Sequence, residues 1–114
     1  MRNFISAQLT DEKVEKVKSL IGQIEAELPF LLALSPSERR AIPTMDSVRK
    51  PFVERALSYG QSESQIVPPY VDLEELRLDL DLYEKLQEIN RRISPLAEKV
   101  DDTTKAVSAD AYGV

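Results

Sequence analysis

Residues 71–93 read VDLEELRLDLDLYEKLQEINRRI, and this stretch decides the predicted fold. On a helical wheel its apolar residues fall into two adjacent stripes with helical spacing. The first stripe contains Leu73, Leu76, Leu80 and Tyr83, and the second contains Leu78, Leu82, Leu86, Ile89 and Ile93. A helix that is apolar over more than half of its circumference has to contact neighbours on two sides. The stretch therefore predicts the central helix of an all-α protein.

The sequence also predicts where this helix begins and which face is polar. Asp72 can cap the helix, and Glu75 completes a pattern that resembles a capping box. Asp81 precedes Lys85 by one helical turn, which is the favourable order for an ion pair on a helix surface. We therefore expect this face to meet water.

Composition limits the function more than it defines it. The 114 residues, 42% of them hydrophobic, suit a single domain over residues 1–114. The net charge of -5 argues against a general affinity for nucleic acids or anionic membranes. The absence of cysteine and histidine excludes disulfides, thiolate sites and imidazole bases or ligands. No signal peptide and no apolar run of about 18 residues is evident, so we expect a cytoplasmic protein.

An amphipathic helix is predicted near the N-terminus. Thr10 is a suitable N-cap, and Pro29 ends the apolar pattern. Leu20 widens a narrow apolar seam of Val14, Val17, Ile21, Ile24 and Leu28. The spacing favours the core of a bundle, and an intermolecular zipper is the alternative.

The apolar connector at residues 30–34, FLLAL, is a candidate interface. We favour its burial against its own bundle, with a role in a homodimer interface as the alternative. The candidate interface residues are Phe30, Leu31, Leu32 and Leu34. Ser35, Pro36 and Glu38 then provide a cap, a first-turn proline and a capping-box acid, so a short helix should run to about Ile42.

A further helix is expected from Asp46 or Ser47 to Tyr59, with Gly60 as its stop. Its predicted buried residues are Val48, Phe52, Val53, Ala56 and Tyr59. Residues 66–70, IVPPY, should be extended because each proline disfavours helix at the residue before it. A role as a proline-rich ligand is the weaker interpretation of that segment.

The Ser94-Pro95 dipeptide suggests a break after the central helix, with Ser94 capping a new helix that carries Leu96, Val100 and Val107. A single helix kinked at Pro95 is the alternative, because no glycine marks a turn there. The predicted fold is thus an up-and-down four-helix bundle with a short extra connecting helix.

Three segments resemble a family of small, uncharacterised bacterial all-helical proteins. They are LPFLLALSPSERRAIPTM at residues 28–45, VPPYVDLEELRLDL at residues 67–80 and EKVDDT at residues 98–103. The resemblance spans most of residues 9–112. It implies a helical fold and carries no activity, cofactor or site residue.

Carboxylates are numerous, but they do not form a recognisable metal site. Without histidine, the ligand set of a di-metal helical bundle cannot be assembled. Asp101 and Asp102 lack the alternating acids and the glycine of a calcium loop, so we interpret them as a solvated acidic turn. Asp79 or Asn90, between the two apolar stripes, could be buried in a structural role. We expect no metal and no cofactor.

Residues 36–60 hold a cluster of basic side chains. The candidate basic patch consists of Arg39, Arg40, Arg49, Lys50 and Arg55. Two helices separated by a turn could act as a helix-turn-helix, although Pro43 in the turn and the acidic chain argue against it.

The sequence shows no glycine-rich phosphate loop and no nucleophile elbow, so we do not expect an enzyme. A non-catalytic protein-interaction or accessory module is the preferred interpretation, with an unknown protein partner or a homodimer. The alternatives are a nucleic-acid-associated regulator that uses the basic patch and, less favoured, a carboxylate-based metal-binding bundle.

Overall fold

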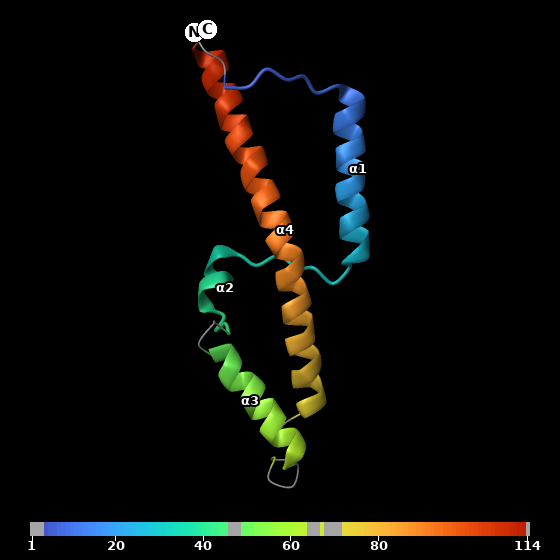
Figure 1. The fold of residues 1–114 in the computed structure, drawn as a ribbon, viewed down its shortest axis with the longest axis vertical. Coiled ribbons are helices and arrows are strands. Elements are labelled where there is room, and N and C mark those ends of the chain that lie inside the picture. Colours follow the sequence, from blue (N-terminus) through green and yellow to red (C-terminus); the bar gives the residue numbers. More distant parts are fainter. Residues whose placement is uncertain (1–3, 46–48, 64–66, 68–71, 114) are drawn as a thin grey trace. The chain divides into compact units, whose positions relative to one another are not determined.

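The computed structural model describes residues 4–45, 49–63, 67 and 72–113. Over these residues the chain is all-helical and contains no β-strand. The helices are α1 (Asp11–Glu27), α2 (Pro36–Ala41), α3 (Arg49–Ser62) and α4 (Leu73–Tyr112) (Figure 1). The prediction of an all-α protein is confirmed.

The chain divides into two compact units. The first unit contains Met1–Pro43 and Thr103–Val114, and the second contains Thr44–Asp102. Helix α4 therefore contributes residues to both units. The first unit also holds α1 and α2, and the second holds α3.

Helix α1 begins and ends where the sequence predicts. The Thr10 side chain accepts a hydrogen bond from the Lys13 amide at 3.1 Å, which satisfies one of the free N–H groups of the first turn. The helix ends at Glu27, and the Leu28 amide donates to the carbonyl of Glu25 at 3.1 Å. Pro29 follows directly and cannot continue the helix.

Helix α2 has the predicted capping box. The Ser35 hydroxyl accepts a hydrogen bond from the Glu38 amide at 3.2 Å, and the Glu38 carboxylate accepts one from the Ser35 amide at 3.1 Å. The pKa of the Glu38 carboxyl is lowered, chiefly by the hydrogen bond with the Ser35 side chain and to a smaller extent by the hydrogen bond with the Ser35 backbone. Pro36 occupies the first turn, and Ile42 is the C-cap. Local chemistry alone is therefore sufficient to place this helix.

The predicted end of α3 is wrong. The helix continues through Gly60 to Ser62, and Gly60 does not have a positive φ. A Cβ added to Gly60 would lie 3.0 Å from a methyl group of Leu73 and 3.3 Å from one of Val67. Gly60 is buried and gives Leu73 room to approach, so its role is helix packing rather than helix termination.

The predicted buried face of α3 is also largely wrong. Phe52 is 71% exposed, Tyr59 is 59% exposed, and Ala56 is exposed as well. Val53 and Leu57 are the half-buried apolar residues of this helix, while Val48 lies outside the described residues, as does most of the segment at 66–70. The periodicity located an amphipathic helix, but the face in contact with α4 is centred elsewhere.

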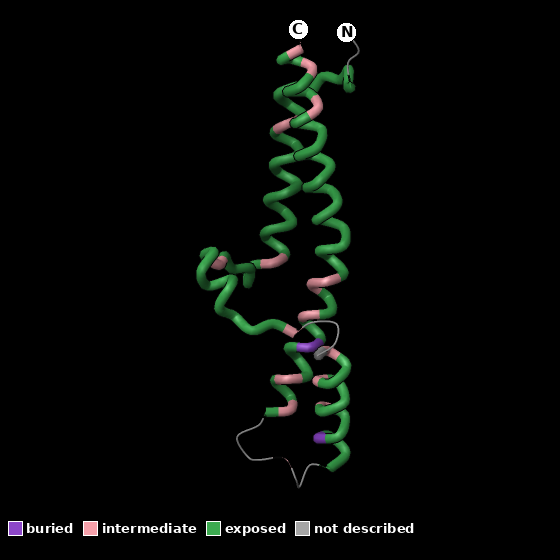
Figure 2. The backbone as a smooth tube through the Cα atoms, turned by 90° about the vertical axis from the view of Figure 1, so that its left-hand side faces the viewer, coloured by how far each residue is buried: buried purple, intermediate pink, exposed green. Residues whose placement is uncertain are grey.

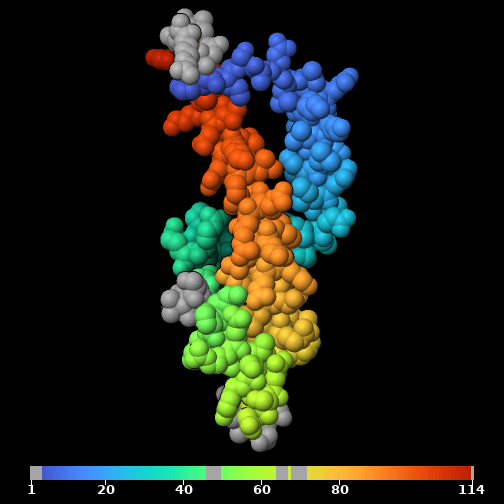
Figure 3. Space-filling model, in the orientation of Figure 1, coloured from blue at the N-terminus to red at the C-terminus, as the bar shows by residue number. Residues whose placement is uncertain are grey.

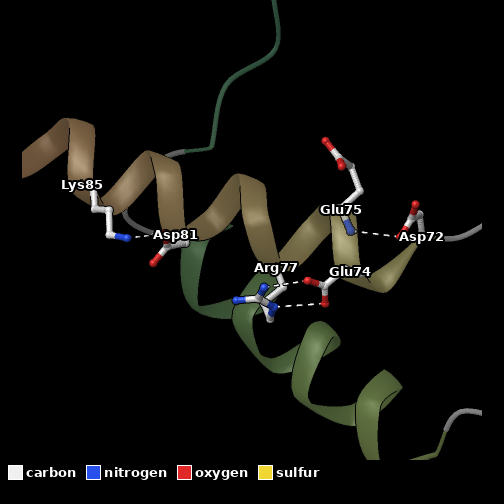
Figure 4. Close-up of polar contacts among 6 residues, drawn as sticks. All are labelled: Asp72, Glu74, Glu75, Arg77, Asp81 and Lys85. Carbon is white, nitrogen blue, oxygen red and sulfur yellow. Dashed lines mark hydrogen bonds and ion pairs between the residues drawn. The ribbon is translucent and has the colours of Figure 1, made fainter. Parts of the chain in front are cut away.

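The start of α4 matches the prediction. The Asp72 carboxylate accepts a hydrogen bond from the Glu75 amide at 3.0 Å (Figure 4). Along the next turns the ammonium of Lys85 lies 2.8 Å from Asp81, which forms the expected ion pair. Exposed pairs of this kind contribute little to stability, so they support the helix without fixing its position.

Helix α4 does not break at Ser94-Pro95, which corrects our preferred prediction. The helix runs from Leu73 to Tyr112 with Pro95 inside it. The Ser94 hydroxyl donates to the side-chain oxygen of Asn90 at 3.3 Å instead of capping a new helix. Strong helix formers dominate both sides of the proline, and no glycine provides a reversal, so helix propagation outweighs the local break signal.

The same continuity corrects the interpretation of the two neighbouring acids. Asp101 and Asp102 lie within α4 and are exposed on its surface, not in a turn. Asp79 and Asn90 are exposed too, so neither occupies the buried structural position that their place on the wheel allowed.

Only one of the two apolar stripes of α4 is covered. Leu80 is 7% exposed and is the one buried hydrophobic side chain among the described residues. Figure 2 shows that most of the described backbone belongs to exposed residues. Leu73, Leu76 and Tyr83 on the same stripe are half-buried. On the second stripe Leu86 is half-buried, and the exposed members are Leu78, Leu82, Ile89 and Ile93. The predicted contacts on two sides are therefore present on one side only.

We predict that Leu80→Ala will lower the free energy of unfolding by about 2–5 kcal/mol, because it removes the best buried side chain between α3 and α4. Urea unfolding followed by circular dichroism measures this loss. Leu96→Ala, at a leucine that is 61% exposed on the same helix, is the matched control. Equal losses for the two variants would contradict the assignment of Leu80 as the core residue.

The two helical glycines should respond differently to alanine. A Cβ at Gly22 meets nothing within 4 Å, so Gly22→Ala should stabilise the protein by about 0.5–1 kcal/mol through helix propensity. Gly60→Ala should give no such gain, because its Cβ would require Leu73 to move. Comparison of the two urea midpoints tests the close approach at Gly60. An equal gain at both sites would show that Gly60 has no packing role.

Candidate interaction surfaces

The apolar connector between α1 and α2 is exposed. Phe30, Leu31 and Leu32 are 50%, 54% and 77% exposed, and Leu34 is half-buried. The Leu31 amide donates a hydrogen bond to the carbonyl of Leu28, the C-cap residue of α1, at 3.3 Å. Burial of the connector within its own chain, our preferred expectation, is therefore not observed. The alternative, an interface role, has the accessible surface that it requires.

The seam of α1 is similarly open. Val17, Ile21 and Ile24 are 45%, 51% and 48% exposed, and Leu20 beside them is 49% exposed. Only Val14 and Leu28, at its two ends, are half-buried. The seam is therefore not the filled core that its spacing favoured, but a continuous apolar strip along a well-formed helix.

A third apolar surface lies where the N-terminal segment meets the end of α4. The Asp110 carboxylate accepts hydrogen bonds from the Phe4 amide at 3.0 Å and from the Ile5 amide at 3.2 Å. Beside this clamp is an open hollow of about 920 Å³ on the surface of the first unit (Figure 3). Its lining consists of residues 5–9, Thr103, Val107, Asp110 and Ala111. Two ends of the sequence thus form one surface.

In the second unit, polar contacts join α3 to α4. The ammonium of Lys50 lies 3.2 Å from Glu84 and 3.5 Å from Glu54. The hydrogen bond to Glu84 is the main reason that the pKa of Lys50 is raised. Lys50 therefore stays protonated at neutral pH and bridges two helices.

Two hydrogen bonds of the Tyr83 hydroxyl connect Met45 to α4. The Tyr83 hydroxyl donates to the carbonyl of Met45 at 3.4 Å and accepts a hydrogen bond from the Gln87 amide group at 2.9 Å. Nearby, a polar hollow of about 300 Å³ lies between α3 and α4. It is lined by Glu54, Leu57, Ser58, Gln61, Arg77, Leu80, Asp81 and Glu84. Among the described residues of the lining, Arg77 is the one basic side chain, and it is paired with Glu74, so these residues offer no free cation to an anionic ligand.

The candidate basic patch is divided between the two units. Arg39 and Arg40 lie in the last turn of α2, and Arg39 donates to the carbonyl of Leu34 at 3.2 Å. Arg49, Lys50 and Arg55 belong to α3 in the second unit. Neither unit by itself brings the five residues together, and the charge of Lys50 is directed at carboxylates.

In the described part of the chain, no three acidic side chains come close enough to share a metal ion. No helix among these residues combines the length and apolarity that crossing a membrane requires.

Comparisons with known proteins give no match. No protein-family model, no curated protein and no solved structure is significantly similar to the chain.

Two contacts of these surfaces escaped the sequence analysis. Asp110 and Phe4 are separated by 106 positions, and Lys50 and Glu84 are far apart as well. Carboxylates and amines are common on helices, and no local spacing links partners at such distances. The cap residues, by contrast, carry their signal within a single turn.

We predict that Asp110→Ala will release the N-terminal segment, because the substitution removes the acceptor for the Phe4 and Ile5 amides. Amide hydrogen exchange at these two residues should accelerate, while exchange in α2 stays unchanged. Asp102→Ala removes an exposed acid from the same helix and is the control. Unchanged exchange at Phe4 and Ile5 in Asp110→Ala would show that the clamp does not hold in solution.

Proposed function

We propose that the protein is a non-catalytic interaction module that completes its hydrophobic core with another protein chain. The observation that carries this proposal is the imbalance between apolar surface and buried core. Among the described residues Leu80 is the one buried hydrophobic side chain, whereas large hydrophobic residues are exposed on α1, α3 and α4.

The energetics support association. Complete burial of a valine, leucine, isoleucine or phenylalanine side chain contributes about 1.5–3 kcal/mol. The surface contacts that hold the helices here, such as the pair of Lys18 with Glu15 at 3.5 Å, contribute about 0–1 kcal/mol each. Such pairs cannot replace a core. Contiguous apolar patches on folded proteins usually mark interaction sites.

The proposed interaction surface belongs to the first unit. It combines the seam of α1 with the connector residues Phe30, Leu31, Leu32 and Leu34. The first three of these connector residues are at least half exposed, and Leu34 is half-buried. The two segments adjoin in sequence, so a partner that covers one can cover both. In this proposal the chain forms an up-and-down four-helix bundle in its assembled state. We also propose that it is a member of the family of small bacterial all-helical proteins.

A melting experiment on the full chain tests the proposal. We expect the midpoint of thermal unfolding to rise with protein concentration over about 1–100 μM, because association stabilises the folded state by mass action. Sedimentation velocity over the same range should show a species larger than the 12.9 kDa chain.

Two other outcomes are informative. A monomer with weak helicity and no cooperative transition would still support the proposal. In that case a different protein, rather than a second copy of this chain, would complete the hydrophobic core. A monomer that unfolds cooperatively with a midpoint independent of concentration would overturn it, since such a chain buries a sufficient core alone.

A further inference from the structure

We propose that α1 pairs antiparallel with α1 of a second copy of this chain. This inference rests on the proposed function, and it names the partner and the geometry of the α1 surface. The seam residues recur at the a and d positions of a heptad. Val17, Ile21 and Ile24 are exposed along a helix of 17 residues, whereas Val14 and the C-cap residue Leu28 are half-buried. The seam consists of Val14, Val17, Ile21, Ile24 and Leu28.

Charges beside the seam identify a second copy as the occupant. With Val14, Ile21 and Leu28 at a, the e positions hold Lys18 and Glu25, which have opposite charges. The Lys18 side chain is 67% exposed, and its pairing with Glu15 spans 3.5 Å. In an antiparallel pair, e positions face e positions across the interface. Helix α1 thus carries both the basic and the acidic residue that an antiparallel pair of identical helices needs for ion pairs across the interface.

One register satisfies the apolar and the charged residues together. When Ile21 packs against Ile24 of the second copy, Val17 packs against Leu28 of that copy. Lys18 then lies opposite Glu25 of the second copy, and the two-fold axis repeats this pair. Each pair adds attraction at the rim of the same apolar contact.

The competing arrangements place like charges together. In a parallel pair, a g position faces an e position, which brings Lys13 against Lys18. An antiparallel pair shifted by one heptad brings Lys18 against Lys18 and Glu25 against Asp11. Charge complementarity therefore selects one direction and one register.

Two heptads give a short interface, so the ends of the seam also contribute. The helical register ends with α1 at Glu27, and the connector that follows starts near the N-terminal end of α1 of the second copy. Leu31 is 54% exposed and available for a contact there. The α1 pairing thus places the connector at both ends of the interface, where it adds apolar area.

Charge reversal tests the pairing in the full chain. Lys18→Glu and Glu25→Lys should each raise the dimer dissociation constant about tenfold, because two attractive pairs become repulsive. The double variant Lys18→Glu/Glu25→Lys should restore it, and so should a mixture of the two single variants. Lys16→Glu makes the same charge change on the outer face of α1 and is the matched control. Sedimentation velocity measures the dissociation constants, and circular dichroism verifies that each variant keeps its helix content.

Each outcome separates the inference from the proposed function. If Lys18→Glu tightens the dimer, the helices pair in parallel and the inference is wrong. If the variants assemble like the control, another surface mediates assembly, so the inference fails while the proposed function stands. A cooperative monomer for the unmodified chain would overturn both.

Cross-linking provides a second readout that does not depend on affinity. The chain has no cysteine, so introduced thiols are the only ones present. Under mild oxidation a mixture of Lys18→Cys and Glu25→Cys should give a disulfide between unlike chains, whereas each variant alone should give little. Efficient cross-linking of either variant with itself would contradict the register.

Discussion

The contact between α3 and α4 is the interaction on which the ordered core of this protein depends. Gly60 brings the backbone of α3 close to Leu73, and Leu80, about two turns further along the same stripe of α4, has 7% of its surface exposed. A side chain at position 60 would separate the helices at this point. Lys50 then bridges the same pair of helices through Glu84. A small set of residues therefore holds α3 against α4.

The rest of the apolar surface has no equivalent cover. The second stripe of α4, the seam of α1 and the connector are all regular in sequence, yet they remain exposed. Helices are held in proteins chiefly by packing of an apolar face, and capping or surface ion pairs add little. A chain with good helices and a small core is suited to assembly. This is the physical basis for a function in protein interaction.

Signals that act within one helical turn were reliable predictors. Thr10, Ser35 and Asp72 cap the helices that the sequence assigns to them, because a side chain next to a free backbone N–H needs no distant partner. At Gly60 and Pro95, by contrast, the local signal predicted a helix end that the structure does not have, because α3 and α4 continue through these residues. A glycine can terminate a helix or admit a neighbour, and a proline can start a helix or lie within one. Neighbouring structure decides between these roles.

The sequence by itself determined the all-α class, the start of three helices and the absence of imidazole and thiol chemistry, since these follow from composition and from contacts a few residues long. Tertiary structure decided which stripe of α4 is buried, how Asp110 holds the Phe4 amide and where Lys50 finds Glu84. Periodicity shows that a face is apolar but does not name what covers it. The covering residues are distant in the chain, and they are selected by shape and charge only when the helices meet.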